Sequence, residues 1–199
     1  MQHVRWSSIL PALALASLSA FAATPTLKIK LKNNSPLEEK KKEQLERLAA
    51  QYDLKKYTIT RDILIEQGVR PHSSPVLTLN GRFLDNDDLA LAVYIHEQGH
   101  WVLMERHRGE MRDLFADLNR AFPGIPSDFP RGSGETMDTY LHLVVCTLEW
   151  DGLADVVGAE RAKAAMELMK ADHYTAIYQV VLENHEKLEA IMKRYGIKF

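Results

Sequence analysis

The sequence of 199 residues has one cysteine, Cys146, and no large excess of either charge. A single cysteine excludes an intrachain disulfide framework and any metal site built from several cysteines. With 25 basic and 27 acidic residues, the chain lacks the basic field that holds nucleic acid, so we expect no nucleic-acid partner. Apart from its extreme N-terminus, it also lacks an apolar run long enough to cross a membrane.

What is present has the composition of one folded domain. Hydrophobic residues make up 46% of the chain and charged residues 26%. This balance supplies a core and is too apolar for intrinsic disorder. The length suits one domain and leaves little room for a second.

The N-terminus has the pattern of an export signal. A short, weakly basic start precedes an apolar run over residues 9–20, and the Ala-Phe-Ala at 20–22 fits the small-x-small motif that signal peptidase cleaves. We therefore expect residues 1–22 to be removed, which leaves a periplasmic or secreted domain over residues 23–199. An uncleaved membrane anchor is the alternative, whereas the cleaved chain is expected to make no stable membrane insertion.

The mature chain is predicted to form a strand, a helix, further strands and then helices. Alternating apolar and lysine residues at 27–31 indicate a strand, and a helix with Ser35 as its N-cap follows over about residues 36–52. Two more β-forming stretches lie at 57–65 and 75–80. Because strands precede helices instead of alternating with them, we predict a mostly helical α+β fold with a small N-terminal sheet.

The second half of the chain is dominated by helical patterns. A long helix is predicted over about residues 89–119, capped within 85–88, and its first part is apolar all round and therefore buried. Prolines and glycines at 121–134 predict a loop, which is a candidate lid over a cleft. Further helices are expected over about residues 135–157, 159–170 and 172–195.

The long helix carries the motif H-E-x-x-H at His96, Glu97 and His100. Histidines four residues apart share one helix face, so both imidazoles can reach one Zn²⁺. Glu97 lies about 100° around the helix, where it reaches a water instead of the metal. The flanks at 92–95 and 101–103 are uncharged, as a buried site requires. Two unconnected histidines on a helix are the alternative.

With this motif and its apolar flanks, the sequence resembles the zincin metallopeptidases over about residues 75–155. The resemblance implies Zn²⁺ held by His96 and His100, with Glu97 as the general base that activates the zinc-bound water. It also implies a third ligand from a second helix, and a peptide or protein substrate lying along a sheet edge at 75–80. An ordinary hairpin strand is the alternative for that segment.

The third ligand separates the branches of this superfamily. The metzincin-like pattern fails because Leu103 and Arg106 occupy its glycine and histidine positions, and His107 lies too far along the helix. The gluzincin-like pattern asks for a downstream glutamate, which Glu149 supplies in an apolar helix. A buried carboxylate needs a partner such as zinc. The aspartate of that pattern is absent, since Leu153 stands in its place.

Other donors lie on the same predicted helix. His142 and Cys146 share a stripe with Glu149, at spacings of four and three residues. Cys146 is a competent zinc ligand, although a lone buried cysteine more often packs in a core. We expect His142 to support the ligands from outside or to donate to a reacting oxyanion. Asp151 and Asp155 are candidate acceptors for the outer N–H of a ligand histidine.

The last helix begins with three residues of possible catalytic use, His173, Tyr174 and Tyr178. In zincin-like enzymes a late histidine or tyrosine stabilises the tetrahedral oxyanion, and the two tyrosines share one helix face. The alternative is that the tyrosines belong to the core and that His173 is exposed.

Taken together, these patterns predict a zinc-dependent hydrolase, and most simply a peptidase. A catalytically silent, zinc-stabilised domain that binds a peptide or a partner is the first alternative. A metal-free helical interaction protein is the second. The sequence carries no signal for the oligomeric state.

Overall fold

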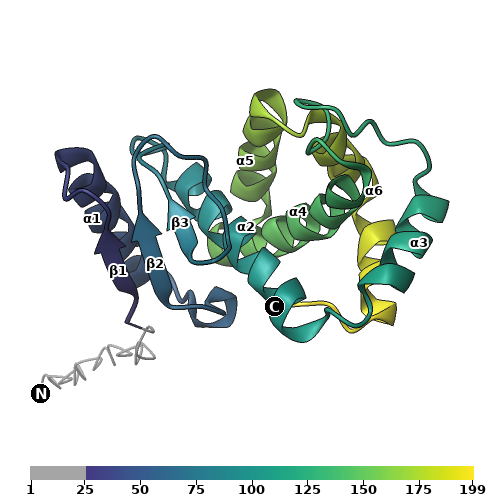
Figure 1. Cartoon of the computed structure of the whole chain (residues 1–199), viewed down its shortest axis with the longest axis horizontal. Coiled ribbons are helices and arrows are strands. Elements are labelled where there is room, and N and C mark those ends of the chain that lie inside the picture. Colours follow the sequence, from purple (N-terminus) through teal and green to yellow (C-terminus); the bar gives the residue numbers. More distant parts are fainter. Residues whose placement is uncertain (1–25) are drawn as a thin grey trace, which may run out of the picture.

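The computed structural model describes residues 26–199, and the predicted signal peptide over residues 1–22 lies outside them. The chain is mostly helical with one small sheet, which confirms the α+β prediction in outline (Figure 1). In chain order the elements are β1 (Lys28–Leu31), α1 (Pro36–Gln51), the 3-10 turn η1 (Lys55–Tyr57), β2 (Asp62–Ile65), β3 (Leu77–Leu79), α2 (Asp87–Arg106), α3 (Met111–Ala121), α4 (Thr136–Val157), α5 (Ala159–Asp172) and α6 (Thr175–Arg194).

The three strands run parallel in the order β1-β2-β3. The helix α1 connects β1 to β2, as a parallel pair requires, because a tight hairpin can join only antiparallel strands. Side chains alternate across the sheet, so Ile63 and Ile65 are buried while Lys28 is exposed. Both α1 and α2 contact this sheet. As predicted, β3 is an edge strand that directly precedes the helix with the H-E-x-x-H motif.

The outer edge of β3 is already paired by the chain itself. The backbone N–H and C=O of Thr78 both bond to His72, at 2.7 and 3.1 Å. These groups point away from β2, where a docked peptide would have to pair. A substrate strand along residues 75–80 would have to displace His72 at Thr78, and its pairing there stays a prediction.

The predicted helix over residues 89–119 is in fact two helices. Helix α2 ends at Arg106, His107 is its C-cap, and α3 begins at Met111. The break falls in a charged, glycine-containing segment with no apolar stripe of its own. A change of direction there allows Leu114 and Leu118 to become fully buried beneath α3.

Helix α2 lies between the sheet at one end of the molecule and helices α3–α6 at the other (Figure 1). Its start follows the predicted capping, because the Asn86 side chain accepts from the backbone of Leu89. Helices α2 and α4 approach closely where Gly152 faces Ile95, and a Cβ at Gly152 would meet the Ile95 side chain at 2.8 Å. Ile95 directly precedes His96, so this close approach brings α4 next to the motif.

No helix within residues 26–199 has the length and apolarity of a bilayer-crossing segment.

Candidate metal centre

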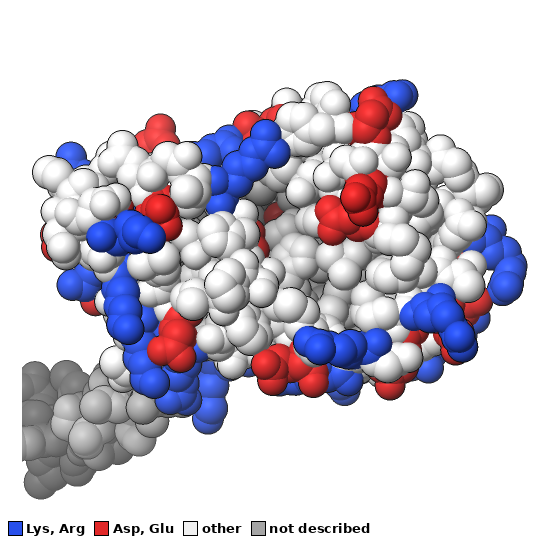
Figure 2. All heavy atoms as spheres, in the orientation of Figure 1, with Lys and Arg blue, Asp and Glu red and all other residues white. Residues whose placement is uncertain are grey.

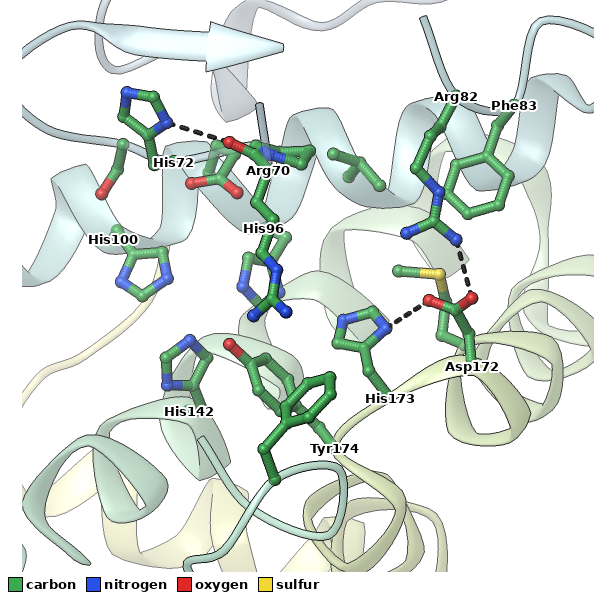
Figure 3. Close-up of a pocket in the computed structure, with 16 residues that line it drawn as sticks. Arg70, His72, Arg82, Phe83, His96, His100, His142, Asp172, His173 and Tyr174 are labelled. Carbon is green, nitrogen blue, oxygen red and sulfur yellow. Dashed lines mark hydrogen bonds and ion pairs between the residues drawn. The ribbon is translucent and has the colours of Figure 1, made fainter. Parts of the chain in front are cut away.

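A cleft of about 490 Å³ opens beside the H-E-x-x-H motif (Figure 3). Helix α2 supplies His96, Glu97 and His100 to its wall, and α4 supplies His142. The opposite wall comes from the junction of α5 and α6, and the loops before β3, after β3 and before α4 close the sides. The volume lies within the range of small-molecule sites, about 300–1,000 Å³.

Three imidazoles converge inside this cleft. The ring centroids of His96 and His100 are 5.1 Å apart, those of His96 and His142 5.5 Å, and those of His100 and His142 4.9 Å. One nitrogen from each ring lies within 4.8 Å of the other two. Figure 3 shows the rings grouped around a common space, with the hydroxyl of Tyr174 directed toward it. The structure therefore brings His142 to the predicted pair.

The outer nitrogen of two of these rings is held by another group. Nδ1 of His96 lies 2.8 Å from Oε2 of Glu149, and Nδ1 of His142 lies 2.7 Å from the backbone oxygen of Asp138. If each Nδ1 carries its proton, it donates to that oxygen and leaves Nε2 unprotonated. This is how ligand histidines are usually oriented in metal sites. No group within residues 26–199 hydrogen-bonds to Nε2 of either ring.

Burial keeps these imidazoles neutral. It lowers the pKa of His96 and of His100 well below 6.5, and the neighbouring rings act in the same direction. Burial also lowers the pKa of His142, which Asp138 partly opposes. Neutral imidazole is the form that binds metal. Three neutral nitrogen donors converging in a solvent-open cleft fit Zn²⁺ in number and in chemical type.

Glu97 lies on the same wall and is 5% exposed. Burial raises the pKa of its carboxyl to about 8, and the charge of Glu149 acts in the same direction. A cation among the histidines would oppose that rise, because a nearby positive charge favours the carboxylate. Glu97 is therefore placed to exchange a proton near neutral pH.

A second cluster lies on the other side of His96 and does not line the cleft. Glu149 is 0% exposed, and its Oε2 accepts from the hydroxyl of Tyr178 at 3.0 Å as well as contacting His96. Cys146 is also fully buried, with its Sγ 4.0 Å from Nδ1 of His96. Burial raises the pKa of Glu149 to about 8, which the Tyr178 hydrogen bond opposes. A nitrogen of His96, the Cys146 sulfur and a Glu149 oxygen also lie within 4.8 Å of one another.

This arrangement bears on Glu149, the predicted third ligand. Glu149 forms a buried group with Cys146 and His96, called the closed cluster below, which has the spacing of metal ligands. Direct coordination of zinc by Glu149 therefore stays a prediction. Its observed contact is with the outer nitrogen of His96, on the side away from the cleft. A carboxylate in that position orients a ligand histidine.

Three other predicted site residues lie elsewhere. Tyr178 was expected at the reacting atoms, but it is fully buried and contacts Glu149 instead of the cleft. Asp151 accepts from His185 at 2.6 Å, and Asp155 accepts from Tyr57 at 2.5 Å. Neither aspartate orients a ligand histidine, which corrects that expectation. Asp151 lies two residues beyond Glu149 and so points about 200° away around the helix.

His173 and Tyr174 do line the cleft, opposite the motif. Tyr174 has left-handed backbone angles, φ 50° and ψ 39°, immediately before α6 begins. Backbone of this kind in a non-glycine residue is costly and is often found at functional sites. Its ring lies 4.6 Å from the ring of His142. Nδ1 of His173 lies 2.8 Å from Asp172, which in turn accepts from Arg82.

The sequence analysis did not identify Arg70 and the rest of the loop before β3, which line the cleft. Phe129 belongs to the predicted loop at 121–134, and its presence in the lining agrees with the suggestion that this loop borders the cleft. The backbone carbonyls of Pro130 and Arg131 accept from the first two residues of α6, which fixes the loop beside Tyr174. No periodic signal marks such positions, because loops follow none.

Comparison with protein-family models, with curated proteins and with solved structures gave no match. The resemblance to zincins therefore rests on the motif residues His96, Glu97 and His100 and their apolar flanks in the sequence.

Proposed function

We propose that this protein is a zinc-dependent hydrolase that cleaves peptide bonds. The single observation that carries the proposal is the convergence of His96, His100 and His142 in a solvent-open cleft beside Glu97. In this assignment His142 takes the place of Glu149 as the third ligand. The fold around it, a helix that follows an edge strand and faces a second ligand-bearing helix, agrees with a zincin-like core.

His96, His100 and His142 would hold the metal through the ring nitrogens that face the cleft. When bound in such a site, zinc supplies a Lewis acid that activates water and polarises a carbonyl near neutral pH. Glu149 holds His96 through Nδ1, and the Asp138 carbonyl does the same for His142. These contacts fix the ring orientations before any ligand arrives, which reduces the cost of assembling the site.

Glu97 would carry the proton. Its carboxylate accepts a proton from the water as the water oxygen bonds to the substrate carbonyl carbon. The same carboxyl then donates that proton to the leaving nitrogen as the carbon–nitrogen bond breaks. Burial of Glu97 and its place beside the cleft keep this carboxyl within reach of both the water and the leaving nitrogen.

Tyr174 and His173 would stabilise the oxyanion that forms on the carbonyl oxygen. Both line the wall opposite Glu97, and the Tyr174 ring lies 4.6 Å from that of His142. Burial raises the pKa of Tyr174, so its hydroxyl stays protonated and able to donate. Donors fixed before the charge develops are among the largest contributions to such catalysis.

The open position of the site favours catalysis over a structural role. Structural zinc sites are usually closed by four protein ligands, whereas catalytic sites have three and leave one position for water or substrate. Here three imidazoles face a cleft of about 490 Å³. A silent zinc-stabilised domain would not need Glu97 held next to that opening.

The proposal is tested by comparing the wild-type protein with Glu97→Gln. For each, zinc content and hydrolysis of a mixed peptide library are measured. We expect one zinc per chain in both proteins and a loss of turnover of about 10²- to 10⁴-fold in the variant, the usual contribution of a general base. Glu105→Gln is the matched control, since Glu105 is an exposed glutamate farther along α2. It should keep full turnover.

Two results would contradict the proposal. Zinc-loaded wild-type protein that cleaves no peptide would favour the silent binding domain. Wild-type protein that takes up no zinc would remove the metal site altogether.

A further inference from the structure

One arginine of the cleft has no acidic partner among residues 26–199, and this bears on the substrate. Arg70 lies on the loop before β3, and its side chain extends into the cleft (Figure 3). Its guanidinium lies 4.8 Å from the ring centre of Phe129, on the opposite loop. Within residues 26–199, its guanidinium forms no ion pair with a carboxylate and no hydrogen bond. The backbone oxygen of Arg70 lies 3.0 Å from Nδ1 of His72.

The second arginine of the cleft differs. Arg82 donates to Asp172 at 2.7 Å, and Asp172 also contacts His173. The charge of Arg82 is therefore matched by a neighbouring carboxylate. Of the residues that the structure describes, two acidic ones line the cleft, Asp172 and Glu97, and Glu97 is assigned to the motif.

The positive charge of Arg70 thus faces the reacting end of the cleft without a fixed counter-charge. This charge lies near the Tyr174 hydroxyl. Burial raises the pKa of Tyr174, and the positive charge of Arg70 acts in the opposite direction. Figure 2 shows basic atoms beside a hollow between the sheet and the helical part of the molecule. A guanidinium presents paired N–H donors in a plane, a shape that matches a carboxylate.

We propose that Arg70 binds a carboxylate of the substrate, so that the enzyme acts on peptides with such a group near the cleaved bond. The inference rests on the proposed function, because it names the substrate class of the same cleft. The carboxylate has two chemical sources, the free C-terminus of a short peptide and the side chain of Asp or Glu. Stacking on Phe129 holds the guanidinium in place, which lowers the cost of ordering it when the anion arrives.

Peptide binding without turnover tests this proposal. Zinc-loaded Glu97→Gln protein is titrated with three pools of acetylated tripeptides. The first has free C-termini, the second has amidated C-termini, and the third is amidated with Asp or Glu as the last residue. We expect a carboxylate-bearing pool to bind about tenfold more tightly than the neutral amides, as a charge-assisted hydrogen-bond pair allows. The first and third pools identify which carboxylate is used.

Arg70→Gln, made in the same protein, should reduce that preference to less than about twofold while the neutral amides bind as before. Arg61→Gln is the matched control, because Arg61 is exposed, forms no ion pair among the described residues and does not line the cleft. It should keep the preference. Since Arg70 is itself exposed, its replacement is expected to leave folding intact.

Equal binding of all three pools, binding of none, or an equal loss for all pools in Arg70→Gln would overturn the proposal. A repeat in chelator-treated protein separates it from the proposed function. If the untreated protein takes up no zinc but the Arg70-dependent preference is measured, the hydrolase proposal fails and the carboxylate site stands. If the protein binds zinc and cleaves peptides but shows no preference for a carboxylate, the hydrolase proposal stands and the carboxylate site fails.

Discussion

The two sides of His96 carry similar donor atoms in opposite environments. On the cleft side, His100 and His142 face solvent-accessible space with Glu97 beside them. On the closed side, Glu149 and Cys146 are both 0% exposed. Both groups have metal-ligand spacing, so spacing alone does not decide between them. For the proposed hydrolase, access to the cleft decides between the two groups. Hydrolysis needs a position open to water and substrate, and the first group lines the cleft, whereas Glu149 and Cys146 do not.

The closed side still has a function in this arrangement. Glu149 and Tyr178 lie one behind the other outside His96, at 2.8 and 3.0 Å. Rigid support of this kind fixes a ligand ring more precisely than the helix backbone can. Under the proposed function, the comparison separates groups that would bind the metal from groups that would orient its ligand, and each class predicts a different size of defect.

The largest loss of zinc affinity is expected when a donor on the cleft side is removed, and removal of a donor on the closed side is its comparison. We predict that His142→Ala lowers zinc affinity by more than about a hundredfold, because even outer partners of metal ligands are worth 10- to 100-fold. Cys146→Ala should leave zinc affinity within about threefold of wild type. Competition with a coloured chelator measures both. The opposite pattern, a large loss only in Cys146→Ala, would assign the metal to the closed cluster.

A smaller effect is expected for Glu149→Gln. The amide oxygen can still accept from His96 but carries no charge, so we predict a loss of zinc affinity of about tenfold, at the low end for an outer partner. Thermal melting of the zinc-free protein serves as the folding control. Complete loss of zinc in a folded Glu149→Gln protein would mean that Glu149 is a direct ligand.

The smallest effect should follow from Tyr178→Phe. This change removes one hydrogen bond to Glu149 without changing the buried shape, and we expect a loss of about 1 kcal/mol in the free energy of unfolding. Zinc affinity should fall by only about two- to fivefold, which is less than for the charge change at Glu149. Denaturant unfolding and chelator competition measure the two quantities.

Tyr195→Phe is the matched control, because Tyr195 also donates to a carboxylate, that of Asp117, but outside the cleft and the closed cluster. It should leave zinc affinity unchanged. If Tyr178→Phe binds zinc as tightly as the wild type, the hydrogen bond from Tyr178 to Glu149 does not contribute to orienting His96.

Much of the local structure could be predicted from the sequence because its signals are local. The cap at Ser35, the helix end at Gly158 and the proline-rich loop before α4 all depend on neighbouring residues. The same holds for the H-E-x-x-H pair, since helix geometry fixes residues four apart on one face. The division of the long helix into α2 and α3 was missed, because it depends on what Leu114 and Leu118 find to pack against.

The choice among His142, Cys146 and Glu149 could not be predicted in this way. The three share one helical stripe, and which of them faces the cleft depends on how α4 crosses α2. That crossing is set by distant contacts such as Gly152 against Ile95. The parallel pairing of the strands is also a long-range property.

The most direct test of the central claim is a crystal structure of the zinc-loaded protein with anomalous diffraction at the zinc edge. We predict one zinc in the cleft, about 2.0–2.1 Å from a nitrogen of each of His96, His100 and His142, with Glu149 still bonded to the outer nitrogen of His96. Zinc bound between Glu149, Cys146 and His96 in the closed core, or no zinc at any of these residues, would contradict it.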